Sequence, residues 1–101
     1  MTLRSLLKGI IEFDELSPIV DLNDGELDFE SLKEDLLQVS YAGTYLLDVG
    51  WYPSFDPSGF FQIRVIKEYD WESPVHITCA KSYKELIGKI VAAQWLILES
   101  M

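Results

Sequence analysis

The sequence predicts an α+β domain: two N-terminal helices, a three-stranded antiparallel sheet, and a C-terminal helix packed on the sheet. Three observations lead to this prediction. Apolar residues recur every three to four positions near both ends of the chain, they alternate with other residues in the middle, and turn-forming residues separate the segments. With 101 residues, 49% of them hydrophobic, the chain can bury one core. We therefore expect a single domain over residues 1–101.

The first helix is predicted over residues 2–12. Leucine and isoleucine recur there at helical spacing, although Gly9 weakens the pattern. We expect Ser17 and Pro18 to break the helix and residues 21–25 to form an acidic turn.

A second helix is predicted over residues 29–39. Asp28 is a suitable N-cap, and apolar residues follow at three- to four-residue steps: Phe29, Leu32, Leu36 and Val39. Glu30 and Glu34 would then lie one turn apart on the outer face and repel each other. Because this arrangement costs stability, we expect the two acids to serve a function.

Three strands are predicted over residues 45–51, 61–66 and 75–79, where the apolar period changes to two. The last helix is predicted over residues 83–98. Ser82 and Glu85 have the spacing of a capping box, and a wide apolar stripe that includes Trp95 is expected to face the sheet.

The net charge of −9 is concentrated in one segment. Residues 12–35 contain ten acids and one lysine, whereas the rest of the chain contains seven acids and seven bases. A local negative field attracts basic partners and repels nucleic acid. An acidic face that only keeps the protein soluble is an equally good interpretation of the charge alone.

Residues typical of catalysis and of metal binding are sparse. The chain has one histidine, His76, and one cysteine, Cys79, and residues three apart on a strand point to opposite faces. No cluster has the spacing of a zinc or calcium site, and the glycines do not form a phosphate-binding loop. We therefore expect a protein that is not an enzyme and that uses no metal and no cofactor.

The sequence favours a cytoplasmic protein that does not contact a membrane. Its longest uncharged apolar run covers residues 90–98, whereas a membrane-spanning helix needs roughly 20 residues. The first residues lack an apolar stretch that ends in a small-residue cleavage site, and a single cysteine fits a reducing compartment.

Two connections between the predicted strands combine aromatic and acidic residues, which together favour contact with a protein. For Trp51 and Trp71 a place in the core is the alternative. The two loops can lie at opposite ends of the sheet, so we expect at least one of them to contact a partner. The predicted partner-binding residues are Asp24, Glu26, Glu30, Glu34, Trp51, Tyr52, Phe55, Asp56, Asp70, Trp71 and Glu72.

The sequences DVGWYPSFDPSG at residues 48–59 and DWESP at residues 70–74 resemble small bacterial immunity proteins. They are similar in particular to the immunity proteins of contact-dependent growth inhibition systems, which neutralise toxin domains, often nucleases, inside the producing cell. The resemblance covers residues 44–92. It implies a monomer that binds one cognate toxin and does not bind nucleic acid.

An acidic inhibitor suits a nuclease toxin, because such a toxin needs a basic surface to hold phosphates. Binding would then occlude the toxin's active site or substrate groove. The alternative function is that of a small acidic adaptor or regulatory domain that binds another basic protein.

Overall fold

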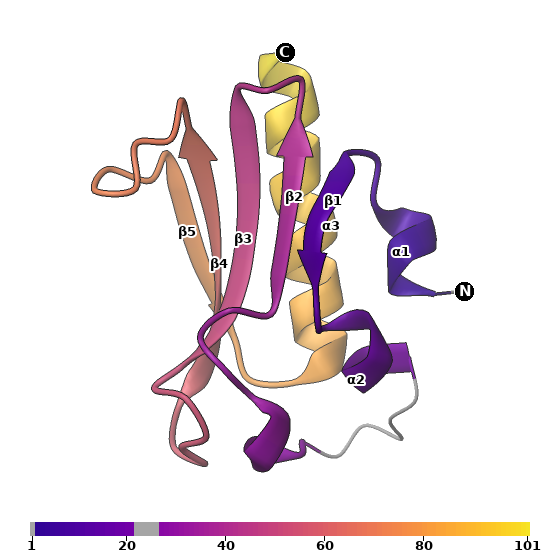
Figure 1. The fold of residues 1–101 in the computed structure, drawn as a ribbon, viewed down its shortest axis with the longest axis vertical. Coiled ribbons are helices and arrows are strands. Elements are labelled where there is room, and N and C mark those ends of the chain that lie inside the picture. Colours follow the sequence, from indigo (N-terminus) through magenta and orange to yellow (C-terminus); the bar gives the residue numbers. More distant parts are fainter. Residues whose placement is uncertain (1, 22–26) are drawn as a thin grey trace.

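A five-stranded antiparallel sheet with a long helix on one face forms the centre of the protein (Figure 1). The computed structural model describes residues 2–21 and 27–101. In chain order the elements are α1 (Leu3–Leu6), β1 (Ile10–Asp14), α2 (Ser17–Asp21), a 3-10 helix (Phe29–Ser31), β2 (Leu37–Tyr41), β3 (Tyr45–Tyr52), β4 (Phe60–Lys67), β5 (His76–Ala80) and α3 (Tyr83–Ser100). The strands lie in the sheet in the order in which they occur in the chain. The predicted α+β class with a C-terminal helix on the sheet is confirmed, but the prediction of three strands is wrong.

The two predicted N-terminal helices are also wrong. Helix α1 ends at Leu6, and the chain continues as β1 beside β2. Gly9 lies so close to Val39 and to the carbonyl oxygen of Ser40 that a Cβ atom would collide with them. Pairing between distant strands therefore outweighs the helical spacing of the isoleucines, as tertiary contacts often outweigh local propensity.

The segment predicted as the second helix contains only the 3-10 helix and β2. Between them the chain runs alongside β3, because the Trp51 N–H donates to the Lys33 carbonyl (2.7 Å) and the Leu36 N–H donates to the Val49 carbonyl (3.0 Å). Glu34 lies in the bulge between these two bonds, and its carbonyl oxygen lies directly against Gly50. Glu34 and Glu30 are therefore not neighbours on a helix.

The second half of the chain follows the prediction closely. Strands β3, β4 and β5 and helix α3 lie within two residues of their predicted bounds. The Ser82 hydroxyl accepts from the Glu85 N–H (3.1 Å), and the Glu85 carboxylate accepts from the Lys81 N–H (2.7 Å), so the predicted capping pair forms. The expectation for Trp95 is wrong, because its side chain is 54% exposed on the far side of α3.

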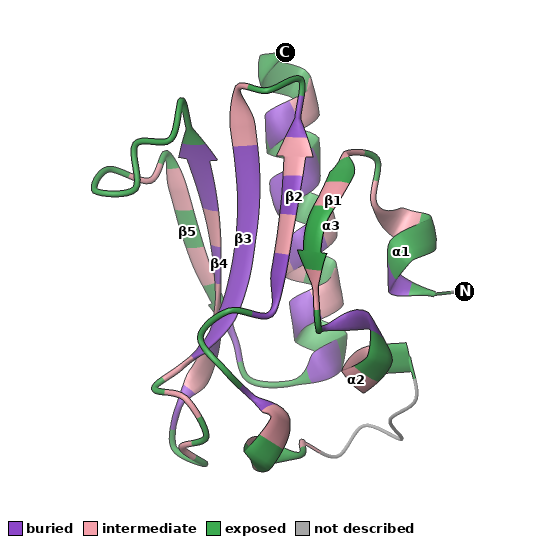
Figure 2. Ribbon diagram, viewed as in Figure 1, coloured by how far each residue is buried: buried purple, intermediate pink, exposed green. Residues whose placement is uncertain are grey.

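The core lies between α3 and the sheet, where Figure 2 shows buried residues along β3 and on the inner side of α3. Trp51 and Phe61 pack edge to face there, with ring centroids 4.9 Å apart. Gln94 is the buried polar link to the N-terminus. Its amide oxygen accepts from the Tyr41 hydroxyl and from the Lys8 N–H, both at 2.7 Å, and its amide nitrogen donates to the Leu6 carbonyl (2.9 Å).

Asp14 explains why Ser17 and Pro18 begin a helix where a helix break was predicted. Its carboxylate accepts from the N–H groups of Leu16 (3.0 Å) and Ser17 (2.8 Å), and proline is well suited to the first turn of a helix. In the predicted turn at 21–25, Asp21 ends α2, and residues 22–25 lie outside the described residues. None of the described helices is long and apolar enough to cross a membrane.

Candidate binding surface on the open face of the sheet

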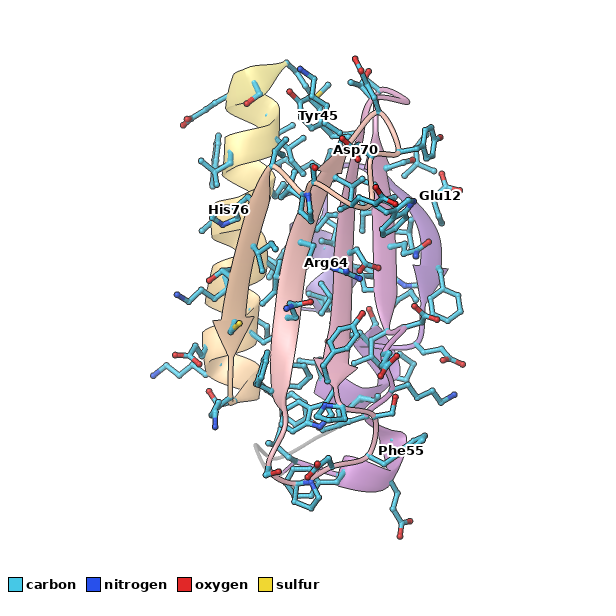
Figure 3. The ribbon with its side chains drawn as sticks, turned by 90° about the vertical axis from the view of Figure 1, so that its left-hand side faces the viewer. Glu12, Tyr45, Phe55, Arg64, Asp70 and His76 are labelled. Carbon is cyan, nitrogen blue, oxygen red and sulfur yellow. The ribbon has the colours of Figure 1, made fainter. Side chains whose placement is uncertain are left out.

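No helix of residues 2–21 or 27–101 covers the face of the sheet that points away from α3, and we call it the open face. Cross-strand partners point to the same side of a sheet, so the strand register identifies its residues. One line of partners crosses all five strands. This central row consists of Phe13, Gln38, Asp48, Arg64 and Ile77. Figure 3 looks onto this face, with Arg64 near its middle.

A bulge in β1 brings two of its residues to the open face. The register shifts between Ile11 and Phe13, so Glu12 is the extra residue. Ile11 packs against the core, whereas Phe13 lies opposite Gln38. The Glu12 carboxylate accepts from the hydroxyl of Ser40 (2.7 Å), which places an acid at the edge of the open face beside an exposed aromatic ring.

An ion pair between Asp48 and Arg64 occupies the centre of the row. Arg64 Nη2 lies 2.8 Å and Nε 3.3 Å from Asp48 Oδ2, and the Gln38 amide donates to Oδ1 (3.3 Å). The aspartate is buried, while the arginine remains partly accessible. Burial raises the pKa of Asp48 above its ordinary value, although the hydrogen bond and the charge of Arg64 act in the opposite direction.

Two aromatic rings hold the guanidinium of Arg64. Its Nη2 donates to the Tyr52 hydroxyl (3.0 Å), and its central carbon lies 5.6 Å from the Tyr52 ring centre and 5.9 Å from that of Trp71. Cation–π contacts of this kind suit the flat guanidinium group. The arginine is therefore held in a fixed position by one carboxylate and two rings.

The loop between β4 and β5 supplies Trp71 and folds back over the open face, near the top of Figure 3, where Asp70 is labelled. Glu68 and Tyr69 both have positive φ angles (55° and 60°), and the Asp70 N–H donates to the Lys67 carbonyl (3.1 Å). Residues other than glycine and asparagine rarely adopt positive φ angles at both central positions of a turn. Tyr69 lines a small hollow with Leu46, and its ring remains largely exposed. The turn thus holds two exposed aromatic rings, those of Tyr69 and Trp71, in place.

Exposed carboxylates lie around this aromatic and polar centre. Glu34 and Asp35, in the bulge before β2, are close enough to Tyr52 that their charges raise the pKa of its hydroxyl, in addition to the larger effect of burial. Together with Glu12 they form what we call the acidic rim. Among the described strand residues that point to the open face, Arg64 is the single base, and its charge is balanced by Asp48.

The structure brings some of the predicted binding residues together. Glu34, Tyr52 and Trp71 lie on the open face, and Asp70 and Glu72 are exposed in the same loop as Trp71. The other loop, with Phe55 and Asp56, lies at the opposite end of the sheet, as Figure 3 shows for Phe55 and Asp70. Phe55 is exposed there at a positive φ of 63°.

Other predicted binding residues lie elsewhere. The prediction for Trp51 is wrong, because its ring is 1% exposed in the core and its indole N–H donates to the Asp56 carbonyl (2.9 Å). Glu30 lies in the 3-10 helix and lines a hollow with Lys33, away from the central row. Asp24 and Glu26 lie outside the described residues.

Sequence reasoning missed all of the central row. The signal for Asp48 and Arg64 is present, since each is a charged residue inside an apolar strand and therefore belongs to the face opposite the core. That they form a pair depends on the register of β3 against β4. Phe13 could not be assigned, because the helix predicted over residues 2–12 covers the first part of β1 and leaves Phe13 outside any predicted strand.

The strand register places His76 on the helix side, opposite Val65, and Cys79 on the open face, opposite Gln62. Within residues 2–21 and 27–101, no group of three or more His, Cys, Asp or Glu side chains could hold a metal ion. None of the known family models, curated proteins or solved structures compared with the chain matches it.

Proposed function

We propose that the protein is an immunity protein that binds a basic toxin domain through the open face of its sheet and so blocks the toxin's active site or substrate groove. The central row is the observation that supports this proposal most directly. Its centre is the partly accessible Arg64, which Asp48 anchors from below, and exposed apolar residues, Phe13 and Ile77, lie at its ends.

The composition of the open face suits protein recognition. Arginine, tyrosine and tryptophan provide most of the binding energy in protein interfaces, and they do so from a central, well-packed patch. Arg64, Tyr52 and Trp71 form such a patch, and both rings already contact the Arg64 guanidinium in the unbound chain. Little side-chain entropy would be lost there on binding, because the groups are ordered before the partner arrives.

The acidic rim supports a basic partner. Glu34 and Asp35 are exposed carboxylates close to Tyr52, and Glu12 is exposed at the β1 edge of the open face. There they would meet lysine and arginine side chains of a surface built to hold phosphates. A nuclease domain is a toxin with such a surface. The resemblance of residues 44–92 to immunity proteins supports the same class of function.

A growth assay tests the proposal. Genes for immunity proteins lie beside those of their toxins, so the toxin domain encoded next to this gene is expressed in cells with and without the protein. The protein should restore growth, and a variant with Trp71→Ala and Glu34→Gln should protect less well at equal expression. Glu99→Gln, an exposed acid on α3, serves as the control and should protect fully. Absence of protection by the wild-type protein would overturn the proposal.

A further inference from the structure

The two edges of the sheet differ in how they are protected. Strand β1 is bulged and carries Glu12 and Asp14, features that discourage pairing with another chain. Strand β5 has an unbroken register against β4 from His76 to Ala80 and contains no charged residue. Among the described residues β4 is its only strand neighbour, so half of its backbone N–H and C=O groups face away from the sheet.

We propose that β5 pairs with β5 of a second copy of this chain, in an antiparallel arrangement that joins the two sheets into one. Pairing centred on Thr78 uses the whole strand and obeys two-fold symmetry. It places Ile77 opposite Cys79 of the second copy on the open face and sets Thr78 opposite its own counterpart, a favourable cross-strand pair. None of these pairs brings like charges together.

The position of α3 fits this dimer. The helix packs on β4 and β5, so its axis lies close to the edge that would form the dimer (Figure 3). With strands about 4.8 Å apart, the two copies of α3 would run about 10 Å from each other, which is a normal distance for packed helices. Exposed apolar side chains of Val75, Ile77 and Leu96 surround this edge and would lose contact with water.

The charge distribution favours a second copy at β5 over a basic partner. Among the described acids of residues 12–35, Glu12 and Asp14 lie on β1, at the opposite edge of the sheet, and Glu34 and Asp35 lie in the bulge before β2. A basic protein would be drawn to that acidic side. Two copies of this chain repel each other except where they approach through their uncharged edges, and β5 is such an edge. The dimer covers Ile77 at one end of the central row and leaves the rest of the open face free. It does not depend on the proposed function, and it departs from the monomer that the resemblance to immunity proteins implies.

Sedimentation equilibrium of the full chain over a dilution series tests the dimer. The wild-type protein should approach twice the chain mass of 11.6 kDa at high concentration. Ile77→Lys should raise the dissociation constant at least about tenfold, because lysine on an edge strand opposes pairing. Ile10→Lys is the matched control on β1, where the isoleucine is 68% exposed against 50% for Ile77, and it should leave the dimer intact.

Cross-linking of the wild-type chain gives a second readout that does not depend on the folding of a variant. In the proposed register the two copies of Cys79 lie on the same face within about 10 Å, so a short bis-maleimide should yield a covalent dimer. A wild-type chain that stays monomeric throughout the series would overturn the proposal. So would a dimer that Ile77→Lys does not weaken or that Cys79 does not cross-link.

Discussion

Arg64 and Asp48 are cross-strand partners on β4 and β3, and their side chains form an ion pair, with 2.8 Å between Nη2 and Oδ2, on the open face of the sheet. The pair links the core to the proposed binding surface. Its acid is buried within the sheet, while its base reaches the aromatic rings of Tyr52 and Trp71. Changes at these two positions therefore affect stability and binding in different ways.

Removal of Arg64 should destabilise the fold at neutral pH. Arg64→Ala leaves the buried Asp48 carboxylate without its partner, which costs on the order of 3 kcal/mol. Burial already raises the pKa of Asp48, and loss of the arginine raises it further. A raised pKa means that ionisation opposes folding, so the penalty should shrink as the pH falls toward 3.8 and the carboxyl becomes protonated.

Urea unfolding of wild type and Arg64→Ala at several pH values measures this penalty. The double variant Asp48→Leu with Arg64→Met is the control, because apolar residues of similar size can replace a buried ion pair at little cost. It should be more stable than Arg64→Ala at neutral pH. A penalty for Arg64→Ala that does not change with pH would contradict the role assigned to Asp48.

The second half of the fold was predictable because the spacing of its apolar residues clearly indicates strands and then a helix. Strand β4 alternates between buried and half-buried residues over most of its length, β3 is an apolar run bounded by turn residues, and α3 has a capping pair followed by a long apolar stripe. Trp95 was misassigned because the stripe is wider than the surface that β4 and β5 offer, so its outer residues face solvent.

The first half was not predictable from local patterns. Leu32 and Leu36 have helical spacing because they bury their side chains on either side of a bulge. The neighbouring residues do not distinguish a bulged, extended segment from a helix. Hydrogen bonding to β3, which lies later in the chain, decides in favour of the extended segment. The central row was missed for the same reason, since it exists only through the pairing of five strands.

Asp14 should stabilise the protein in a pH-dependent way. Burial would raise its pKa, but hydrogen bonds from Ser17, Arg4 and Leu16 together hold the pKa below its ordinary value of 3.8. A lowered pKa gives stability that is fully present above 3.8 and is lost as the pH falls through the folded value. Asp14→Ala should cost about 1 to 2 kcal/mol at neutral pH, as loss of a helix cap does.

The free energy of unfolding of wild type and Asp14→Ala, measured at neutral pH and well below 3.8, checks this. The difference between the two proteins should narrow in acid. An equal difference at both pH values would show that the aspartate acts only through packing.

Two glycines should respond in opposite ways to a methyl group. Gly50→Ala places a Cβ against the carbonyl oxygen of Glu34, in a segment tied to β3 by the bond between Trp51 and Lys33, and should cost about 2 kcal/mol or more. Gly88 lies in α3 with open space beside it, so Gly88→Ala should stabilise the protein by up to about 1 kcal/mol. Urea midpoints that shift in the same direction for both variants would contradict this packing.

The acidic rim should act mainly on the association rate. A triple variant, Glu12→Gln with Glu34→Gln and Asp35→Asn, should associate with the basic toxin domain several-fold more slowly at low salt. Near physiological salt the difference should shrink, because the Debye length is then about 8 Å. Surface plasmon resonance at two salt concentrations measures both rates.

The matched control removes the same charge away from the open face, with Asp28→Asn, Glu30→Gln and Glu99→Gln. If both triple variants associate equally slowly, then the net charge of the chain matters and the open face has no special role.

Binding of the toxin domain by two tryptophan variants tests the central claim most directly. Trp71 is 40% exposed on the open face, and Trp95 is 54% exposed on α3 on the other side of the molecule, so their truncations remove similar exposed groups from opposite faces. Trp71→Ala should weaken binding by about 2 kcal/mol, or roughly thirty-fold, chiefly through faster dissociation, while Trp95→Ala should bind like the wild type. Unchanged binding by Trp71→Ala together with a loss in Trp95→Ala would contradict the open face as the binding surface.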